Sequence, residues 1–326
     1  MDYGIIYVRS KWELREAGNP TVAVLMSTYN GEKYVSEQIE SILSQRDVNI
    51  KLYIRDDGSE DKTLSILKQY SALDNVELVI DGENLGPGNS FMRLLYNYAG
   101  LEGIEFFAFA DQDDIWFSDK VAVAIEELGD SRQAKLYCSN QNIFKNGTDC
   151  GLRYTEPQDI SLIGHITKNT IAGCTFVFTK KLANIIAGSR HVNEELLRYR
   201  LHDAWIMLVA ICCGKVFYDE RSYMNYRIHN ANVVGVKKES VLTKLKKLGR
   251  LVDSRRKDRN VRMKTAEQLL LCFPEINKKN RGILSVIANY QKDVGSRMRL
   301  LRDGRFCQNT GESRWMFIMK VLINFL

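Results

Sequence analysis

The chain has 326 residues, of which 45% are apolar and 26% are charged, with four prolines and 22 glycines. This composition excludes a disordered chain, a collagen-like chain and a proline-rich linker. The net charge of +6 is unevenly distributed, because residues 1–236 carry a net charge of −8 and the last 90 residues a net charge of +14. An acidic body with a basic tail indicates an anionic partner, either nucleic acid or a membrane surface.

The seven cysteines are odd in number and form no CxxC pair. A disulfide framework is therefore not expected, and the cysteine pattern fits a reducing cytoplasm. No stretch approaches 18 uninterrupted apolar residues, so the sequence predicts no transmembrane helix.

The first part of the chain alternates apolar runs with amphipathic helical patterns. Strands are predicted at 22–26, 51–54, 76–80 and 105–110, and helices between them at 35–43, 64–70 and 91–98. Ser59 is the expected N-cap of the second helix. Strands separated by helices of this length predict right-handed crossovers and an α/β fold with a mostly parallel, Rossmann-like sheet.

Beyond residue 134 the pattern becomes mixed. Strands are expected at 134–139 and 175–179, and a buried helix at 204–213 that ends at Gly214. Past Gly235 the sequence predicts long amphipathic helices. Their apolar stripes run through Val241, Leu245, Leu248 and Val252, and through Ile283, Ile287, Tyr290, Val294, Met298 and Leu301.

Polar clusters follow three of the predicted strands, where ligands bind in parallel sheets. The last of them, residues 111–114, contains three carboxylates in four residues, and these repel one another unless a cation lies among them. Mg²⁺ bridging to a ligand's phosphates would satisfy such a loop, and a solvated acidic turn or helix cap is the alternative. The clusters are Thr28-Tyr29-Asn30, Asp56-Asp57 and Asp111-Gln112-Asp113-Asp114.

The first two clusters have side chains that suit a nucleotide. Asp57 is placed to accept a hydrogen bond from the imide N–H of uracil or thymine, whereas Asp56 is expected to form an Asx turn. Thr28 and Asn30 offer a hydroxyl and an amide to the same nucleotide. Alternatively, Asn30-Gly31 simply forms a turn.

Four motifs in order carry a family resemblance: VAVLMSTYNGEKYVSEQIESILSQ, YIRDDGSEDKT, ENLGPGNSF and AFADQDDIWFSDK. They resemble the family 2 glycosyltransferases of GT-A fold, and the DQDDIW…DK form is most similar to the bacterial rhamnosyltransferase branch, which builds cell-surface polysaccharides. The resemblance runs from about Val22 to Gly235. It implies a GT-A domain over 1–235, with a donor-binding half at about 20–134 and an acceptor half at about 135–235. Residues 236–326 would form a basic, amphipathic helical C-terminal region.

The resemblance also implies roles in the donor half. Thr28, Tyr29, Asn30 and Asp57 would surround the base and ribose of a nucleotide-sugar, and Asn84 would face the donor sugar or diphosphate. Asp111, Gln112 and Asp113 would form the donor-binding DxD motif. Asp111 and Asp113 would bind Mn²⁺ or Mg²⁺, with Asp113 as the principal ligand.

The second half has counterparts of two further motifs. His202-Asp203-Ala204-Trp205 resembles the HD-W motif, whose aspartate is the general base. Residues 226–232 resemble the YR-H--N motif, whose histidine, His229, would complete the metal site. The helix dipole is expected to keep Asp203 ionised. A helix-capping carboxylate for Asp203 and a half-buried structural histidine for His229 are the alternatives.

The acceptor side would be lined by Gly173, Cys174 and His202, because Gly173-Cys174-Thr175 resembles a family segment on that side. Cys174 is expected to be a small buried residue rather than a nucleophile. Trp116 either stacks on a sugar ring or belongs to the core.

The implied reaction is inversion by one in-line displacement, with Asp203 as base and no covalent intermediate. The expected substrates are dTDP-rhamnose and a lipid-linked or growing cell-surface polysaccharide. A UDP-hexose transferase is the alternative of the same chemistry. A catalytically silent nucleotide-sugar-binding scaffold is the alternative of another class.

The C-terminal segment has the composition of an interfacial helix, with basic residues before it. No zinc-finger spacing, RNP-like motif or clear helix-turn-helix is found, which argues against nucleic acid. We therefore expect a cytoplasmic protein that is peripheral on the inner face of the cytoplasmic membrane. Packing on the catalytic domain, or a homodimer contact, is the alternative for the same apolar residues: Trp315, Phe317, Ile318, Val321, Leu322, Ile323, Phe325 and Leu326.

Overall fold

The computed structural model describes residues 18–229, 260–307 and 313–326. The predicted stripe at 241–252 lies outside these residues. The donor half contains β1 (Thr21–Thr28), α1 (Val35–Leu43), β2 (Asn49–Asp56), α2 (Thr63–Tyr70), β3 (Val76–Ile80), α3 (Pro87–Tyr98), β4 (Phe106–Ala110), β5 (Ile115–Trp116) and α4 (Lys120–Leu128).

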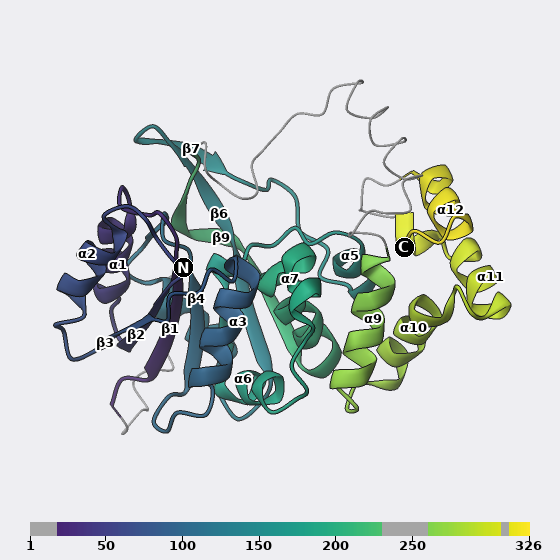
Figure 1. The fold of residues 1–326 in the computed structure, drawn as a ribbon, viewed down its shortest axis with the longest axis horizontal. Coiled ribbons are helices and arrows are strands. Elements are labelled where there is room, and N and C mark those ends of the chain that lie inside the picture. The colour runs from purple at the N-terminus through teal and green to yellow at the C-terminus, as the bar shows by residue number, and fades with distance from the viewer. Residues whose placement is uncertain (1–17, 230–259, 308–312) are drawn as a thin grey trace, which may run out of the picture.

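The next elements are β6 (Lys135–Lys145), β7 (Thr148–Leu152), α5 (Leu162–Thr167), a 3₁₀ turn at Gly173–Thr175, β8 (Val177–Thr179), α6 (Lys180–Ala187), α7 (Glu194–Cys213) and β9 (Lys215–Arg227). The C-terminal helices are α9 (Val261–Cys272), α10 (Lys278–Asn289), α11 (Val294–Arg302) and α12 (Arg314–Leu322). Figure 1 shows them at the end of the molecule opposite α1 and α2.

The strands form one sheet in the order β3-β2-β1-β4-β8-β6-β9-β5, with β7 paired to β6. The pairings among β3, β2, β1 and β4 are parallel, as is that of β6 with β9. The pairings of β8 with β4 and β6, of β5 with β9 and of β7 with β6 are antiparallel. The predicted α/β class is confirmed, and the sheet as a whole is mixed because the parallel crossovers of the donor half are not continued beyond β4.

The core has two layers, one on each face of the sheet, because side chains alternate along every strand. From β1, Val22, Val24 and Met26 pack with the buried residues of α1, α2 and α4. Ala23 and Leu25 point to the other face and pack with α3, α6 and α7. Both layers stop at the carboxyl ends of β1, β2 and β4, so the polar residues that follow these strands are left for a site.

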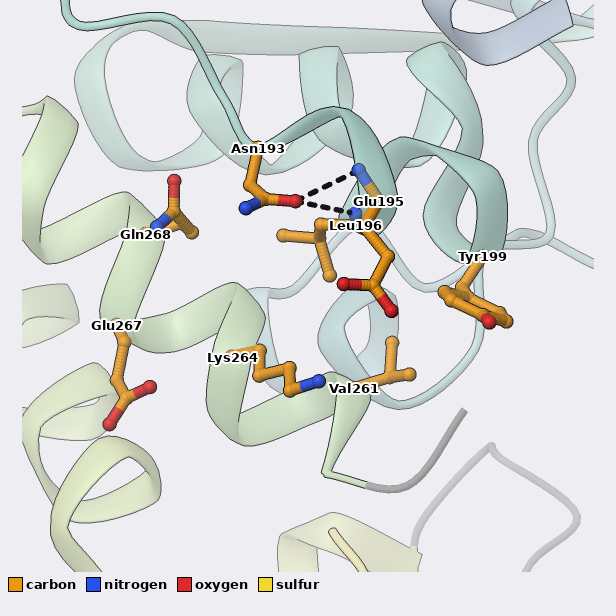
Figure 2. A pocket seen from close by; sticks show the side chains of 8 residues that line it. All are labelled: Asn193, Glu195, Leu196, Tyr199, Val261, Lys264, Glu267 and Gln268. Carbon is orange, nitrogen blue, oxygen red and sulfur yellow. Dashed lines mark hydrogen bonds between the residues drawn. The ribbon is translucent and has the colours of Figure 1, made fainter. Parts of the chain in front are cut away.

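Helix α7 begins earlier than predicted, at Glu194 rather than Ala204. Asn193 caps it, since its side-chain oxygen accepts the backbone N–H groups of Glu195 and Leu196 (Figure 2). The helix is interrupted at Leu201, whose φ of 58° and ψ of 169° are not helical. The predicted stretch is therefore the second segment of a kinked helix.

Ser59 is not the N-cap of α2, which begins at Thr63 with Lys62 in the capping position. The Ser59 hydroxyl instead donates to Asp56, and its oxygen accepts the backbone N–H of Asn30. The side chain thus fastens the loop after β2 to the loop after β1, which competes with capping.

The predicted stripe at 283–301 is not one helix but two. Helix α10 ends at Asn289, and Asp293 caps α11 by accepting the N–H groups of Gly295 and Ser296. Val294 is consequently 78% exposed, while Tyr290 is buried. The sequence analysis predicted one helix because the helical spacing of apolar residues continues from α10 into α11. The cap formed by Asp293 interrupts the helix without interrupting this spacing.

The last helix, α12, has one buried face and one exposed face. Phe317 and Val321 are fully buried in the same cluster as the apolar residues of α3 and α7. Trp315 and Leu322 are 58% and 52% exposed. The segment thus packs on the body of the protein through one apolar face, to which Leu326 also contributes. Among the helices that the structure describes, none is both long enough and apolar enough to cross a bilayer.

Candidate active site

A cleft of about 1130 Å³ opens at the carboxyl ends of β1, β2 and β4. Residues from both predicted halves line it. Its lining includes the predicted residues Thr28, Tyr29, Asn30, Asp57, Asn84, Asp111, Gln112, Asp113, Gly173, His202, Asp203 and His229.

Gln112 connects the ends of β1 and β4. Its side-chain amide forms two hydrogen bonds with Tyr29, accepting the backbone N–H at 2.8 Å and donating to the carbonyl at 2.9 Å. This pairing joins Gln112 to the backbone of Tyr29, so Gln112 positions the loop after β1. The Tyr29 ring remains 47% exposed in the cleft.

Asn30 forms the turn that was the alternative to nucleotide binding. Its φ of 48° is left-handed, a conformation that asparagine tolerates. Its side-chain oxygen accepts the backbone N–H of Glu60 at 2.8 Å. The next residue is a glycine, and a larger residue would not fit there, because an added Cβ on Gly31 would lie 2.3 Å from the Oε1 atom of Gln112.

Asp56 adopts the expected turn. Its carboxylate accepts the N–H groups of Gly58 and Ser59 and the Thr28 hydroxyl, which is buried. The hydroxyl proton of Thr28 is therefore used within the protein.

Asp57 is buried and holds the loop that carries Asn84. Its carboxylate accepts the backbone N–H groups of Leu85 and Gly86, each at 2.8 Å, and pairs with the fully buried guanidinium of Arg55. An ionised carboxylate has about four acceptor positions, so one remains on Oδ2 for a ligand. The sequence did not indicate Arg55, whose role depends on contacts across β2 and β3.

Asp113 and His229 are in direct contact, with 2.6 Å between Oδ2 and Nε2. Asp111 lies in the same cleft, and burial together with the charges of Asp113 and Asp203 raises its pKa to about 7. The structure thus brings two of the three predicted ligands into contact, whereas the ligand atoms of Asp111 do not gather with those of Asp113 and His229 within 4.8 Å. Carboxylate oxygens are ligands that suit Mn²⁺ or Mg²⁺. A cation would also relieve the repulsion that raises the pKa of Asp111.

A second grouping of ligand atoms lies beneath this set. Atoms of Asp111, Asp114 and Cys174 are within 4.8 Å of one another. Asp114 and Cys174 are fully buried and do not line the cleft. Cys174 is thus the small buried residue that the sequence predicted, but it is not exposed on the acceptor side.

Trp116 belongs to the core rather than to the acceptor side. Its ring is buried, and the Nζ atom of the buried Lys120 lies 3.7 Å from the ring centroid. Its backbone N–H donates to Ser41 in α1. The indole therefore cannot stack on a sugar in this structure.

Asp203 lies in the first turn after the Leu201 kink. Burial raises its pKa to about 7, although backbone N–H groups of Ala204 and Gly173 and the charge of Arg153 act in the opposite direction. The helix terminus therefore does not keep the pKa of this carboxylate at its ordinary value, because the desolvation cost exceeds the stabilisation from these groups.

His202 is buried between aromatic rings. It stacks on Phe91 with 4.0 Å between ring centroids and meets the edge of Phe109. Burial lowers its pKa to about 3, so it is neutral. Gly173 packs against it so closely that an added Cβ would lie 2.6 Å from Nε2.

Several lining residues were missed by the sequence analysis. Arg153 follows β7, the loop 169–172 follows α5, and Tyr199, Arg200 and Leu201 belong to the kink of α7. Tyr199 also lines a smaller hollow of about 100 Å³ between α7 and α9, which Figure 2 shows. No motif marks these positions, because they reach the cleft through the irregular conformation of α7 and the loops.

Comparison with known proteins identifies the family. The family model "Glycosyl transferase family 2" matches residues 23–197. The dTDP-rhamnosyl transferase RfbG of Shigella flexneri is 31% identical over 237 residues, covering 69% of this chain and 78% of that protein.

Two solved structures share the fold. TarS of S. aureus, residues 1–349, has a TM-score of 0.55 at 18% identity, covering 92% of this chain and 80% of that one. The mannosyltransferase PcManGT of Pyrobaculum calidifontis, in complex with GDP-Man and Mn²⁺, has a TM-score of 0.51 at 14% identity, covering 94% and 86%. The chain has the GT-A fold, belongs to glycosyl transferase family 2 and is a glycosyltransferase.

Proposed function

We propose that the protein is an inverting, metal-dependent transferase that moves rhamnose from dTDP-rhamnose to a lipid-linked or growing cell-surface polysaccharide. The similarity to a dTDP-rhamnosyl transferase supports the donor. The observation that carries the chemistry is that one cleft contains the Asp113–His229 contact, the half-buried Asp203 and an exposed Tyr29.

The donor half, about residues 20–134, would bind the nucleotide. The exposed Tyr29 ring would stack on the base, and the remaining acceptor position of Asp57 would receive the imide N–H. Gln112 would hold Tyr29 through its hydrogen bonds to the backbone of that residue. Thr28 and Asn30 would fix the loops after β1 and β2, because their side chains bond to Asp56 and to the backbone of Glu60. Asn84 would contact the donor sugar or diphosphate.

Asp111, Asp113 and His229 would hold the cation. PcManGT, a neighbour in fold, is described with Mn²⁺, which supports metal dependence. When bound, the cation would stabilise the charge that develops on the diphosphate leaving group. The contact between Asp113 and His229 supports this assignment, and Asp111 lines the same cleft.

Asp203 would accept the proton of the acceptor hydroxyl. A pKa of about 7 keeps a large share ionised at neutral pH, yet makes the carboxylate a better proton acceptor than an exposed aspartate. Gly173 would help position it, because its backbone N–H acts on the carboxylate. His202 would supply a neutral wall on the acceptor side. No Ser or Cys nucleophile is required.

A UDP-hexose is the second candidate donor. TarS has been described in complex with UDP-GlcNAc, and the contacts of Tyr29 and Asp57 do not separate uracil from thymine. A silent scaffold is disfavoured, because Asp113, Asp203 and His229 are all present and line one cleft.

Thermal-shift measurements test the donor. We expect dTDP-rhamnose with Mn²⁺ or Mg²⁺ to raise the melting temperature more than UDP-glucose or UDP-GlcNAc with the same ion. Release of nucleoside diphosphate in the presence of cell-envelope glycolipid then tests transfer. If only the UDP-sugars stabilise the protein, the donor is a UDP-hexose rather than dTDP-rhamnose. If none of the three nucleotide-sugars stabilises it, the proposal is contradicted.

We further propose that the C-terminal region, 236–326, places the enzyme on the inner face of the cytoplasmic membrane. The exposed Trp315 and Leu322 on α12, beside a basic sequence, support an interfacial contact. A homodimer contact through the same residues is the competing explanation.

A double variant, Trp315→Ser with Leu322→Ser, separates these explanations better than truncation, because Phe317 and Val321 are part of the core. We expect the variant to lose flotation with phosphatidylglycerol vesicles while remaining folded. Unchanged flotation contradicts the membrane proposal. A change in oligomeric state without a change in flotation supports the dimer.

A further inference from the structure

Arg153 is a positively charged residue of the cleft to which the family motifs give no role. It follows β7 and lines the same cleft as Asp113 and Asp203. Its charge acts on Asp203, whose pKa it lowers against the effect of burial. It therefore lies close enough to the proposed base to influence groups that react there.

The guanidinium is held in place before any ligand binds. Its Nη1 atom donates to the Oε1 atom of Gln141 at 2.6 Å, and its backbone N–H donates to the Gln141 carbonyl. The rings of Tyr154 and Tyr226 each lie 5.2 Å from its Cζ atom. Gln141 itself is buried. This arrangement reduces the conformational entropy that a ligand contact would otherwise cost.

No carboxylate of the described residues lies within ion-pair distance of Arg153. By contrast, Arg55 pairs with Asp57 and Asp81, and Arg227 pairs with Glu37. Arg200, which also lines the cleft, donates to Thr265 and to the carbonyl of Ile166 and so connects α7 to its neighbours. Arg153 thus presents an ordered positive charge that the described part of the protein does not neutralise.

The proposed reaction supplies an anion for this charge. The bond from the anomeric carbon to the phosphate oxygen breaks and its electron pair stays on that oxygen, while the acceptor oxygen bonds to the carbon and its proton passes to Asp203. The diphosphate thereby changes from two negative charges to about three, one more than a divalent cation balances. A guanidinium matches phosphate oxygens in geometry and charge, whereas sugar hydroxyls need no cation.

We propose that Arg153 is a phosphate-binding residue, which contacts either the diphosphate of the donor or a phosphate on the acceptor. This inference rests on the proposed function and adds a residue to it. The fixed position of the guanidinium predicts that lysine, which keeps the charge without the planar fork, substitutes only in part.

The experiment compares Arg153→Gln and Arg153→Lys with Arg132→Gln as the control, since Arg132 is 88% exposed and pairs with its neighbour Asp130. Binding of dTDP and of UDP is measured by calorimetry with Mn²⁺, and binding of dodecyl diphosphate is measured with nucleotide saturating. Circular dichroism and melting temperature establish that each variant is folded.

If the phosphate belongs to the donor, Arg153→Gln weakens nucleotide binding by roughly 10- to 100-fold, the loss expected for a charge-assisted hydrogen bond. Arg153→Lys falls between, and the control is unchanged. If the phosphate belongs to the acceptor, only dodecyl diphosphate binds more weakly. Unchanged binding of both ligands to a folded Arg153→Gln overturns the inference while leaving the proposed function in place.

If the wild-type protein binds neither dTDP nor UDP, it is the proposed function that fails. Inorganic pyrophosphate then tests Arg153 by itself. A wild-type affinity that Arg153→Gln reduces supports phosphate binding, and equal affinities overturn it.

Discussion

The Nε2 atom of His229 lies 2.6 Å from the Oδ2 atom of Asp113, although 116 positions separate the two residues in the chain. Asp113 is in the loop after β4, and His229 follows β9, so the contact joins the end of the acceptor half to the donor half. The ring of Tyr34 lies 5.1 Å from that of His229 and limits its position from the donor side. Neither half contains the complete set of proposed metal ligands.

Substitution of His229 tests this relationship. We expect His229→Gln to raise the Mn²⁺ concentration that gives half-maximal transfer by roughly tenfold or more, because one proposed ligand is lost while both carboxylates remain. Asp113→Ala should abolish transfer at any Mn²⁺ concentration. The measurement is a metal titration of turnover, with the exposed Asp74→Asn as control. An unchanged titration in His229→Gln would show that the histidine is structural.

Asp203→Asn separates catalysis from donor binding. We expect transfer to fall to background, since the amide cannot accept the proton, while the affinity for nucleoside diphosphate with Mn²⁺ stays within about twofold of wild type. Calorimetry gives the affinity, and release of nucleoside diphosphate gives the rate. Normal turnover by this variant would exclude Asp203 as the base.

The pH dependence follows from the raised pKa of Asp203. Since a base acts when deprotonated, kcat should rise with pH through about 7 and level off above it. The stability effect has the opposite sign. Above pH 7 the carboxylate is ionised in the folded protein, so the whole cost of desolvating it is subtracted from the free energy of unfolding. Near pH 4 the folded protein holds it protonated, and this cost is absent. Asp203→Asn should therefore raise the melting temperature at pH 8 but not at pH 4. A flat rate profile between pH 5.5 and 8.5 would be inconsistent with this role.

Asp57 is expected to matter for stability as well as for the nucleotide. Asp57→Ala removes one of the two carboxylates that pair with the buried Arg55 and frees the N–H groups of Leu85 and Gly86. We expect a loss of about 3 kcal/mol in the free energy of unfolding, as for other broken buried pairs. Urea denaturation measures it, and Asp74→Ala is the matched exposed control. A loss equal to that of the control would mean that Arg55 is satisfied without Asp57.

Gly31 tests the pairing between the ends of β1 and β4. An added Cβ would lie 2.3 Å from Gln112 Oε1, so Gly31→Ala must displace the amide that pairs with Tyr29. We expect weaker nucleotide binding in Gly31→Ala, and a much smaller further effect when Gln112→Ala is already present. A double-mutant cycle on nucleotide affinity measures this coupling. Additive effects would indicate that Gly31 acts independently of Gln112.

The sequence predicted the donor half well because its information is local. The predicted strands are short, and a polar cluster directly follows the strands at 51–54 and 105–110, so parallel pairing brings Asp57 and Asp113 to one edge of the sheet. The structure confirms this placement. The roles of these residues towards substrate stay predictions.

What the sequence could not supply depends on contacts that are distant along the chain. Arg55 and Arg153 acquire their positions from Asp81 and Gln141, and no spacing rule reports such pairs. The sequence cannot decide whether Trp116 stacks on a sugar or belongs to the core, because an aromatic ring suits both places. Its burial and the packing of Lys120 against it show that it belongs to the core. The break between α10 and α11 was not predicted, because the spacing of apolar residues gives no information about capping by Asp293.

The kink at Leu201 divides α7 into two segments with different attachments. The first segment is tied to α9 through the contact of Arg200 with Thr265, and the second begins with the turn that carries Asp203. One non-helical residue therefore links the C-terminal helices mechanically to the proposed base. Arg200 and Asp203 are only three positions apart, so we expect a change in the packing of α9 to alter the orientation of the proposed base.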